Sequence, residues 1–154
     1  MIHPKWRLSH AQGFLSLGLV AEAAAELEQI PAPERDALEV LALRVAVLQE
    51  QQDWPALGRA AAEFVRRAPE EAGAWVTWAY ATRRAASLDA AEKILLDAER
   101  AHPAEPAIQF NLGCYACQRG DLAEARRRVD RAIALDGKFA ATAATDPDLA
   151  PLRA

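Results

Sequence analysis

Two cysteines and three histidines are the residues in this chain whose chemistry suits redox reactions, metal binding or catalysis. Cys114 and Cys117 form a C-x-x-C pair, but a redox pair of this kind follows a strand in a βαβ unit, and these two lie in the middle of a stretch with helical apolar spacing. A structural zinc ion needs four ligands, and the sequence contains no second Cys or His pair. We therefore expect both thiols to pack as small apolar groups, with Cys114 partly exposed at a groove, and we expect no metal site.

The histidines do not indicate a catalytic site. His3, His10 and His102 are far apart in the sequence, and His10 falls at a packing position of the first predicted helix, where we expect a half-buried ring. The chain has no phosphate-binding loop, no G-x-S-x-G, no H-E-x-x-H and no dinucleotide-binding glycine pattern. The sequence therefore predicts that the protein is not an enzyme and carries no cofactor.

The charge balance argues against nucleic acid as a partner. The formal net charge is −4 and the sequence pI is about 5.4, whereas nucleic-acid-binding proteins usually show a basic footprint. The one basic cluster consists of Arg126, Arg127, Arg128 and Arg131. We expect these arginines to form a solvated face of a helix.

The apolar segments are short. Phe14 to Val20 is interrupted by Ser16 and Gly18 and is followed by Glu22, which does not match the layout of a signal peptide. No stretch approaches the roughly 18 apolar residues that a membrane span needs. The sequence therefore predicts a soluble, cytoplasmic protein with no membrane partner.

The elements that position these residues repeat along the chain. Four stretches align at a spacing of about 34 residues, starting near Pro4, Leu38, Ala72 and Pro106. Such a period is typical of stacked helical repeats, and the alanine-rich composition favours helices over strands. The apolar spacing predicts an all-α chain with helices at about 5–17, 20–30, 35–51, 55–68, 73–85, 89–101, 107–119 and 122–135.

Small residues recur where the two helices of each repeat meet. Small side chains at these places allow the helix axes to approach at the short end of the usual range of about 8–10 Å. The equivalent positions are Ala11, Ala79 and Gly113 in the first helices, with Val45 as the exception, and Ala23, Ala91 and Ala125 in the second helices, with Leu57 as the exception.

The last residues have the pattern of a cap. Phe139 to Ala144 predicts a short helix, which Asp146-Pro147-Asp148 ends, so that Leu149 and Leu152 fold back. A terminal repeat needs such a cover to stay in solution.

These positions resemble the tetratricopeptide repeat family. The residues that carry the resemblance are Trp75 and Ala79, Leu112 and Gly113, Ala91 and Ala125, Leu95, Ala98, Ala132, Pro69 and Pro103. Arg7 and Gln109 depart from it, because they replace the aromatic residue of the family pattern, and Gly137 replaces its proline. The resemblance implies an α-solenoid, a right-handed superhelical array of antiparallel helix pairs. It contains about four repeats (4–37, 38–71, 72–105 and 106–139) and a cap at 138–154, all in a single domain over 1–154.

The resemblance also implies a binding surface. In this family the first helices of successive repeats line a concave groove. Tyr80 and Phe110 are the expected anchors, and Arg83 or Arg84 the expected partners of a carboxylate, although Phe110 and Val76 suit packing between repeats equally well. The groove positions carried over to this chain are Leu8, Gln12, Ala42, Ala46, Gln49, Val76, Tyr80, Arg83, Arg84, Phe110 and Cys114.

One subtype of the family does not fit. Members that grip the C-terminal carboxylate of chaperones use Lys, Asn and Arg side chains, but the matching positions here hold Leu8, Gln12, Leu43, Gly73 and Thr77. The sequence therefore favours a protein- or peptide-binding adaptor that lacks this clamp. Two alternatives stay open: a self-associating structural module, which would make the protein a homo-oligomer, and a small secretion chaperone of the same repeat type.

Overall fold

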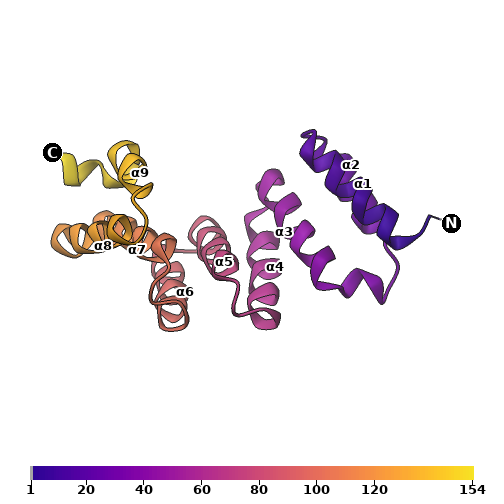
Figure 1. Ribbon diagram of the computed structural model, residues 1–154, viewed down its shortest axis with the longest axis horizontal. Helices are drawn as coiled ribbons and strands as arrows, with labels where there is room; N and C mark the ends of the chain where they lie inside the picture. Colours follow the sequence, from indigo (N-terminus) through magenta and orange to yellow (C-terminus); the bar gives the residue numbers. More distant parts are fainter. Residues whose placement is uncertain (1) are drawn as a thin grey trace. The chain divides into compact units, whose positions relative to one another are not determined.

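The structure is a computed structural model that describes residues 2–154, and the described residues form helices and no strands. The prediction of an all-α array of about four helix pairs is confirmed (Figure 1). The pairs are α1 (Pro4–Ser16) with α2 (Val20–Glu28), α3 (Leu38–Gln51) with α4 (Trp54–Arg67), α5 (Ala72–Ala85) with α6 (Leu88–Ala101), and α7 (Pro106–Gln118) with α8 (Leu122–Leu135). None of the described helices is long and apolar enough to cross a membrane.

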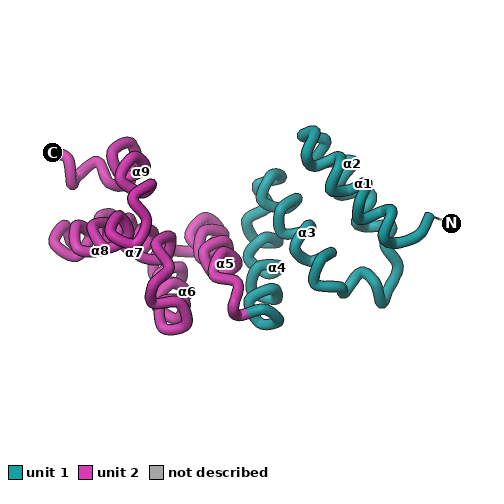
Figure 2. Tube along the Cα trace, viewed as in Figure 1, with its two compact units in different colours: residues 1–68 teal, residues 69–154 magenta. Residues whose placement is uncertain are grey.

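The chain divides into two compact units, one ending at Ala68 and the other beginning at Pro69 (Figure 2). Unit 1 contains α1 to α4, and unit 2 contains α5 to the C-terminus. Each unit has its own apolar core, around Leu27 and Ile30 in unit 1 and around Leu95 and Ile108 in unit 2. That residues 1–154 form a single domain stays a prediction.

The helices α4, α6 and α8 begin in the same way, at equivalent positions of their repeats. The side chains of Asp53, Ser87 and Asp121 each accept a hydrogen bond, 3.1 Å long, from the backbone N–H three residues later. Such caps satisfy one of the free N–H groups at a helix start. In the turns just before α2 and α8, Gly18 and Gly120 take the left-handed conformation, with φ of 75° and 83°.

The predicted small positions are buried, and at Gly113 two helices lie close together. Ala11, Ala23 and Ala91 are fully buried. Gly113 of α7 has the closest contact: a Cβ placed there would lie 2.9 Å from Cγ2 of Val129 on α8 and 3.3 Å from the backbone oxygen of Ala125. Glycine is therefore the residue that lets α7 and α8 come this near.

The junction between the first two pairs differs from the prediction. The second helix ends at Glu28 instead of about residue 30, and residues 34–36 form a separate turn, η1 (Glu34–Asp36), before α3 begins at Leu38. Arg35 stabilises this end of the helix, because its guanidinium donates to the backbone oxygens of Glu28 and Ile30 at 2.7 and 2.8 Å. These carbonyls would otherwise lack helix partners.

The C-terminal cap is confirmed. The short helix α9 (Phe139–Thr145) is followed by the 3-10 segment η2 (Pro147–Arg153), and Leu149 folds back until only 1% of it is exposed. Arg153 fastens the two pieces by donating to the backbone oxygens of Ala143 and Asp146 at 2.8 and 3.0 Å.

Candidate binding groove

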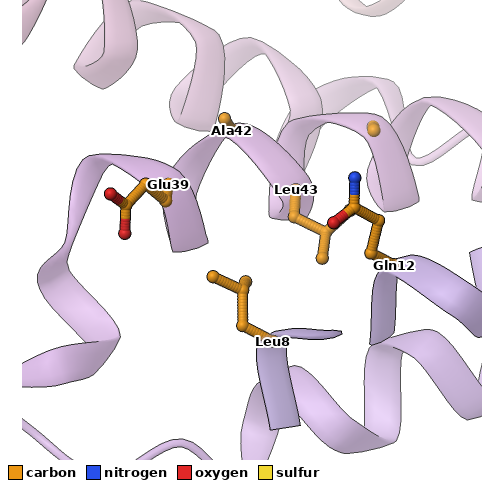
Figure 3. Close-up of a pocket in the computed structure, with 6 residues that line it drawn as sticks. Leu8, Gln12, Glu39, Ala42 and Leu43 are labelled. Carbon is orange, nitrogen blue, oxygen red and sulfur yellow. The ribbon is translucent and has the colours of Figure 1, made fainter. Parts of the chain in front are cut away.

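In unit 1 the first helices α1 and α3 enclose an open hollow of about 520 Å³. Leu8 and Gln12 extend from α1 toward Ala42 and Leu43 on α3, and Glu39 stands at one side (Figure 3). The lining combines leucine and alanine side chains with one amide and one carboxylate. Its residues are Leu8, Gln12, Glu39, Ala42, Leu43 and Ala46.

A smaller hollow of about 290 Å³ adjoins the first, since both are lined by Leu8 and Glu39. It continues toward the N-terminal end of α1, where His3, Pro4 and Lys5 line it. The apolar surface between α1 and α3 is therefore longer than one pocket.

Of the predicted groove residues in this unit, the structure brings Leu8, Gln12, Ala42 and Ala46 together around the larger hollow. Gln49 is exposed near the C-terminal end of α3 and does not line the hollow. Glu39 and Leu43 were absent from the sequence-based set, although each lies within one helical turn of Ala42, a spacing that the helical period could have indicated.

In unit 2, three predicted groove residues of α5, namely Tyr80, Arg83 and Arg84, make polar contacts within the chain. Arg83 pairs with the Asp148 carboxylate of η2 at 2.6 Å, and its guanidinium carbon lies 5.3 Å from the centre of the Tyr115 ring. The Asp148 hydrogen bond raises the pKa of Arg83. Arg84 donates to the Tyr80 hydroxyl at 2.9 Å. Val76, the fourth groove residue of this helix, packs against the core of unit 2.

The two predicted groove residues of α7 are buried. Phe110 is 6% exposed, and its ring centre lies 5.1 Å from that of Phe139 on α9, so it takes the packing role that the sequence left open. Cys114 is 4% exposed, so the prediction of a partly exposed thiol is wrong. The physical reason is the C-terminal segment, which packs against α7 and covers the positions that the repeat pattern assigns to the groove.

Cys114 forms the one potential metal-binding group found among the described residues, together with Asp146 and Asp148, whose ligand atoms lie within 4.8 Å of one another. Burial and the two neighbouring carboxylates raise the pKa of the Cys114 thiol to about 12. Metals bind the thiolate, and the Asp148 carboxylate already pairs with Arg83. The donor set therefore fits a metal ion poorly. Burial also raises the pKa of Tyr115, to about 12.

The arginine cluster is only partly a solvated face. Arg126, Arg127 and Arg131 are exposed, but Arg128 is 9% exposed and points toward α6 and α7. Its guanidinium binds Glu99 of α6, the amide oxygen of Gln109 at 2.9 Å and Glu124 at 2.7 Å. The prediction of a wholly outward face was wrong because Gln109, at the aromatic position of the repeat, leaves a buried amide that needs partners.

The contacts with the arginines lower the pKa of both Glu124 and Glu99. The pKa of Glu124 falls to about 2, chiefly through hydrogen bonds from Arg127 and then Arg128, against the opposing effect of burial. Burial acts most strongly on Glu99 and would raise its pKa, but hydrogen bonds from Arg128 and Gln109 outweigh it and the pKa is lowered. Both carboxylates are therefore ionised and hold three helices together.

The first repeat of unit 1 also has a polar residue, Arg7, at the aromatic position of the repeat. Leu41 occupies the equivalent position in the second repeat. Arg7 takes the place of the aromatic residue and pairs with Glu26 of α2 at 2.9 Å. His10, expected to be half-buried, is exposed instead, with its ring centre 6.5 Å from that of Trp6. The packing positions of α1 next to His10 are taken by Ala11 and Phe14.

Solved structures of MamA are similar to this chain. A double mutant of the RS-1 protein aligns with a TM-score of 0.77 at 16% identity, over 88% of this chain and 76% of that chain. MamA from Desulfovibrio magneticus RS-1, from residue 41 to its end, aligns with a TM-score of 0.74 at 19% identity, over 88% of this chain and 78% of that chain. MamA of MSR-1 aligns with a TM-score of 0.62 at 17% identity, over 96% of this chain and 88% of that chain.

No family model matches the chain, and no curated protein sequence does. The structural likeness therefore bears on the fold. The chain has the tetratricopeptide-repeat type of fold, as the sequence resemblance implied.

Proposed function

We propose that this chain is a non-enzymatic scaffold that binds a protein or peptide through the first helices of its repeats. The observation that carries the proposal is the open hollow between α1 and α3, lined by Leu8, Ala42, Leu43 and Ala46. Apolar concave surfaces with a few polar groups at the edge are typical of binding sites. The repeat type of the fold supports a protein partner in general.

The lining suits an extended or helical segment with an apolar anchor. Ala42 and Ala46 lie one turn apart on α3 and project little, so a partner backbone can approach the helix closely. Leu8 and Leu43 offer apolar contact, while Gln12 and Glu39 remain exposed for hydrogen bonds. The partner best matched to this surface carries an apolar side chain with a donor group beside it.

A steric variant tests the proposal. Peptides selected from a random displayed library on the full chain are titrated against the wild type and Ala42→Lys. Because the lysine side chain takes up space beside the apolar lining and adds a charge there, we expect it to weaken binding at least about tenfold, or about 1.4 kcal/mol. The control is Ala25→Lys, an identical change at an exposed position of α2 that does not line the hollow.

The control is expected to bind like the wild type. A library that yields no binding peptide, or a selected peptide that binds Ala42→Lys as tightly as the wild type, would remove the basis of the proposal.

Self-association is the second candidate. The observation in its favour is the exposure of Trp6, at 65%, because large aromatic side chains are enriched in protein interfaces. Leu149, an apolar residue near the C-terminal end of the described chain, is buried and so does not contribute to such an interface. The test is sedimentation over micromolar concentrations, where a chain that stays monomeric throughout would rule out this candidate.

A further inference from the structure

The segment Asp146–Arg153 lies on the part of unit 2 that the repeat pattern assigns to the groove. Phe110 and Cys114 of α7 are the equivalents, one repeat later, of Val76 and Tyr80 of α5. In the structure η2 packs on α7, and its Asp148 reaches Arg83 of α5. The chain therefore places its own C-terminal segment where the proposed function would place a partner.

The contacts have the form of peptide recognition. Arg83 binds the Asp148 carboxylate at 2.6 Å, and the Gln118 amide donates to the backbone oxygen of the same aspartate at 3.1 Å. The next residue, Leu149, is 1% exposed and joins the core of unit 2. A charged side chain, a main-chain carbonyl and an apolar anchor are each bound by a different group of the helices.

The arginine is positioned by the helices as well as by the segment. Its guanidinium lies over the ring of Tyr115, 5.3 Å from the centre, and Tyr115 is itself 1% exposed. The cation–π contact favours this position of the guanidinium independently of the carboxylate. The site for the carboxylate is thus a feature of α5 and α7.

The bound segment has little structure of its own. It is a 3-10 turn that contains Pro147 and Pro151, both exposed, and neither proline can donate a backbone hydrogen bond. Leu149 is the one fully buried residue of η2, while Leu152 packs against the same core half-buried, and Arg126 and Arg153 add surface hydrogen bonds to backbone oxygens. Segments held by few buried contacts open without unfolding the rest of a protein.

We propose that the surface of α5 and α7 around Arg83, Phe110, Cys114 and Gln118 is a binding site for a partner segment in which an aspartate directly precedes a leucine, and that residues 146–153 occupy it until such a partner displaces them. The inference rests on the proposed function and adds a second site, on α5 and α7, together with the kind of segment that binds there. Because the partner competes with a tethered segment, its apparent affinity is reduced by the fraction of time that the site is open.

The test uses a fluorescent synthetic peptide of residues 145–154 and the full-length chain. In the variant Asp148→Asn the tethered segment loses its ion pair with Arg83 while its volume is kept, so the peptide is expected to bind at least about tenfold more tightly than to the wild type. Adding Arg83→Ala to this variant is expected to abolish binding. Adding Arg100→Ala, an exposed arginine of α6 paired with Asp97, is the matched control and is expected to change nothing.

Hydrogen exchange of the wild type gives a second measurement that needs no variant. The Leu149 N–H, which donates to Asp146, is expected to exchange at least about tenfold faster than the amides of α7, because the segment opens on its own. Equal rates would mean that η2 opens only when the unit unfolds, and would overturn the proposal. Cooperative loss of structure in Asp148→Asn would do the same.

Two further outcomes would overturn it: a folded Asp148→Asn chain that does not bind the peptide, and a wild-type dimer that Arg83→Ala dissociates, since a second copy would then be the occupant. Neither result depends on the hollow of unit 1. The proposed function is therefore tested by Ala42→Lys, whereas this inference is tested by the variants of Arg83 and Asp148.

Discussion

At the residue scale, the polar network of Arg128, Glu99, Gln109 and Glu124 is the part of the molecule that the repeat pattern least explains. It joins α6, α7 and α8 inside unit 2. Buried side-chain N and O atoms without a hydrogen-bond partner are absent from the described residues, so the network is complete. A satisfied network of this kind fixes how the helices pack, because a shift would leave a charge unpaired.

Arg128→Ala is expected to lower the free energy of unfolding by about 2–3 kcal/mol, because it leaves Glu99 and Gln109 without their shared partner. Urea denaturation measures the change. The matched control is Arg127→Ala, whose side chain is 60% exposed and pairs with the same Glu124. Its expected cost is below about 1 kcal/mol. Equal costs for the two variants would show that the buried network contributes nothing special.

Acid is expected to remove the contribution of Glu124. Its pKa is about 2 in the folded chain, below the value of 4.5 for the free side chain, so its stabilisation is fully present above pH 4.5 and is lost as the pH falls toward about 2. The measurement is the difference in unfolding free energy between the wild type and Glu124→Gln as a function of pH. The difference should shrink on acidification, and a difference independent of pH would show that the charge is not the stabilising group.

At the element scale, the contact between α7 and α8 depends on the absence of a side chain at Gly113. Gly113→Ala is expected to destabilise the chain by about 1–3 kcal/mol, because the new methyl group meets Val129 at 2.9 Å and the helices must separate. Gly73→Ala is the control: a Cβ there meets nothing within 4 Å, so the expected change is neutral or up to about 1 kcal/mol stabilising. Thermal unfolding distinguishes them, and a neutral Gly113→Ala would contradict the packing account.

Most of the elements could be predicted from the sequence, because the forces that form them are local or periodic. The small residues, the left-handed glycines and the capping residues recur at equivalent positions of the repeats, and each has a local physical role. The contacts of Arg35 at the end of α2 could not be predicted, since this side chain reaches back to the carbonyls of Glu28 and Ile30. A long side chain that turns back on the chain has no periodic signature.

The candidate site was predictable only where no terminal segment covers the first helices of the repeats. In unit 1 the helical period and the family resemblance led to Leu8, Gln12, Ala42 and Ala46, which surround one hollow. In unit 2 the same reasoning missed that the C-terminal segment covers Phe110 and Cys114. The sequence indicated that Leu149 folds back, but the pairing of Asp148 with Arg83, 65 residues away, depends on the tertiary structure.

At the scale of the whole molecule, the two units offer the same kind of surface in different states. In unit 1 the first helices leave a hollow of about 520 Å³ open. In unit 2 the equivalent positions of α7 are covered by α9 and η2. The positions of α1 and α3 that line the hollow are therefore open to solvent, whereas Phe110 and Cys114 of α7 are part of the core of unit 2.

The most direct test of the central claim is an NMR titration of the full-length chain with a library-selected peptide. If the first helices of the repeats form the binding surface, the backbone signals of Leu8, Gln12, Ala42 and Ala46 will shift with peptide concentration, while those of exposed residues on α2 and α4, such as Ala25 and Arg59, will stay in place. Shifts confined to α2 and α4, with none on α1 or α3, would contradict the account.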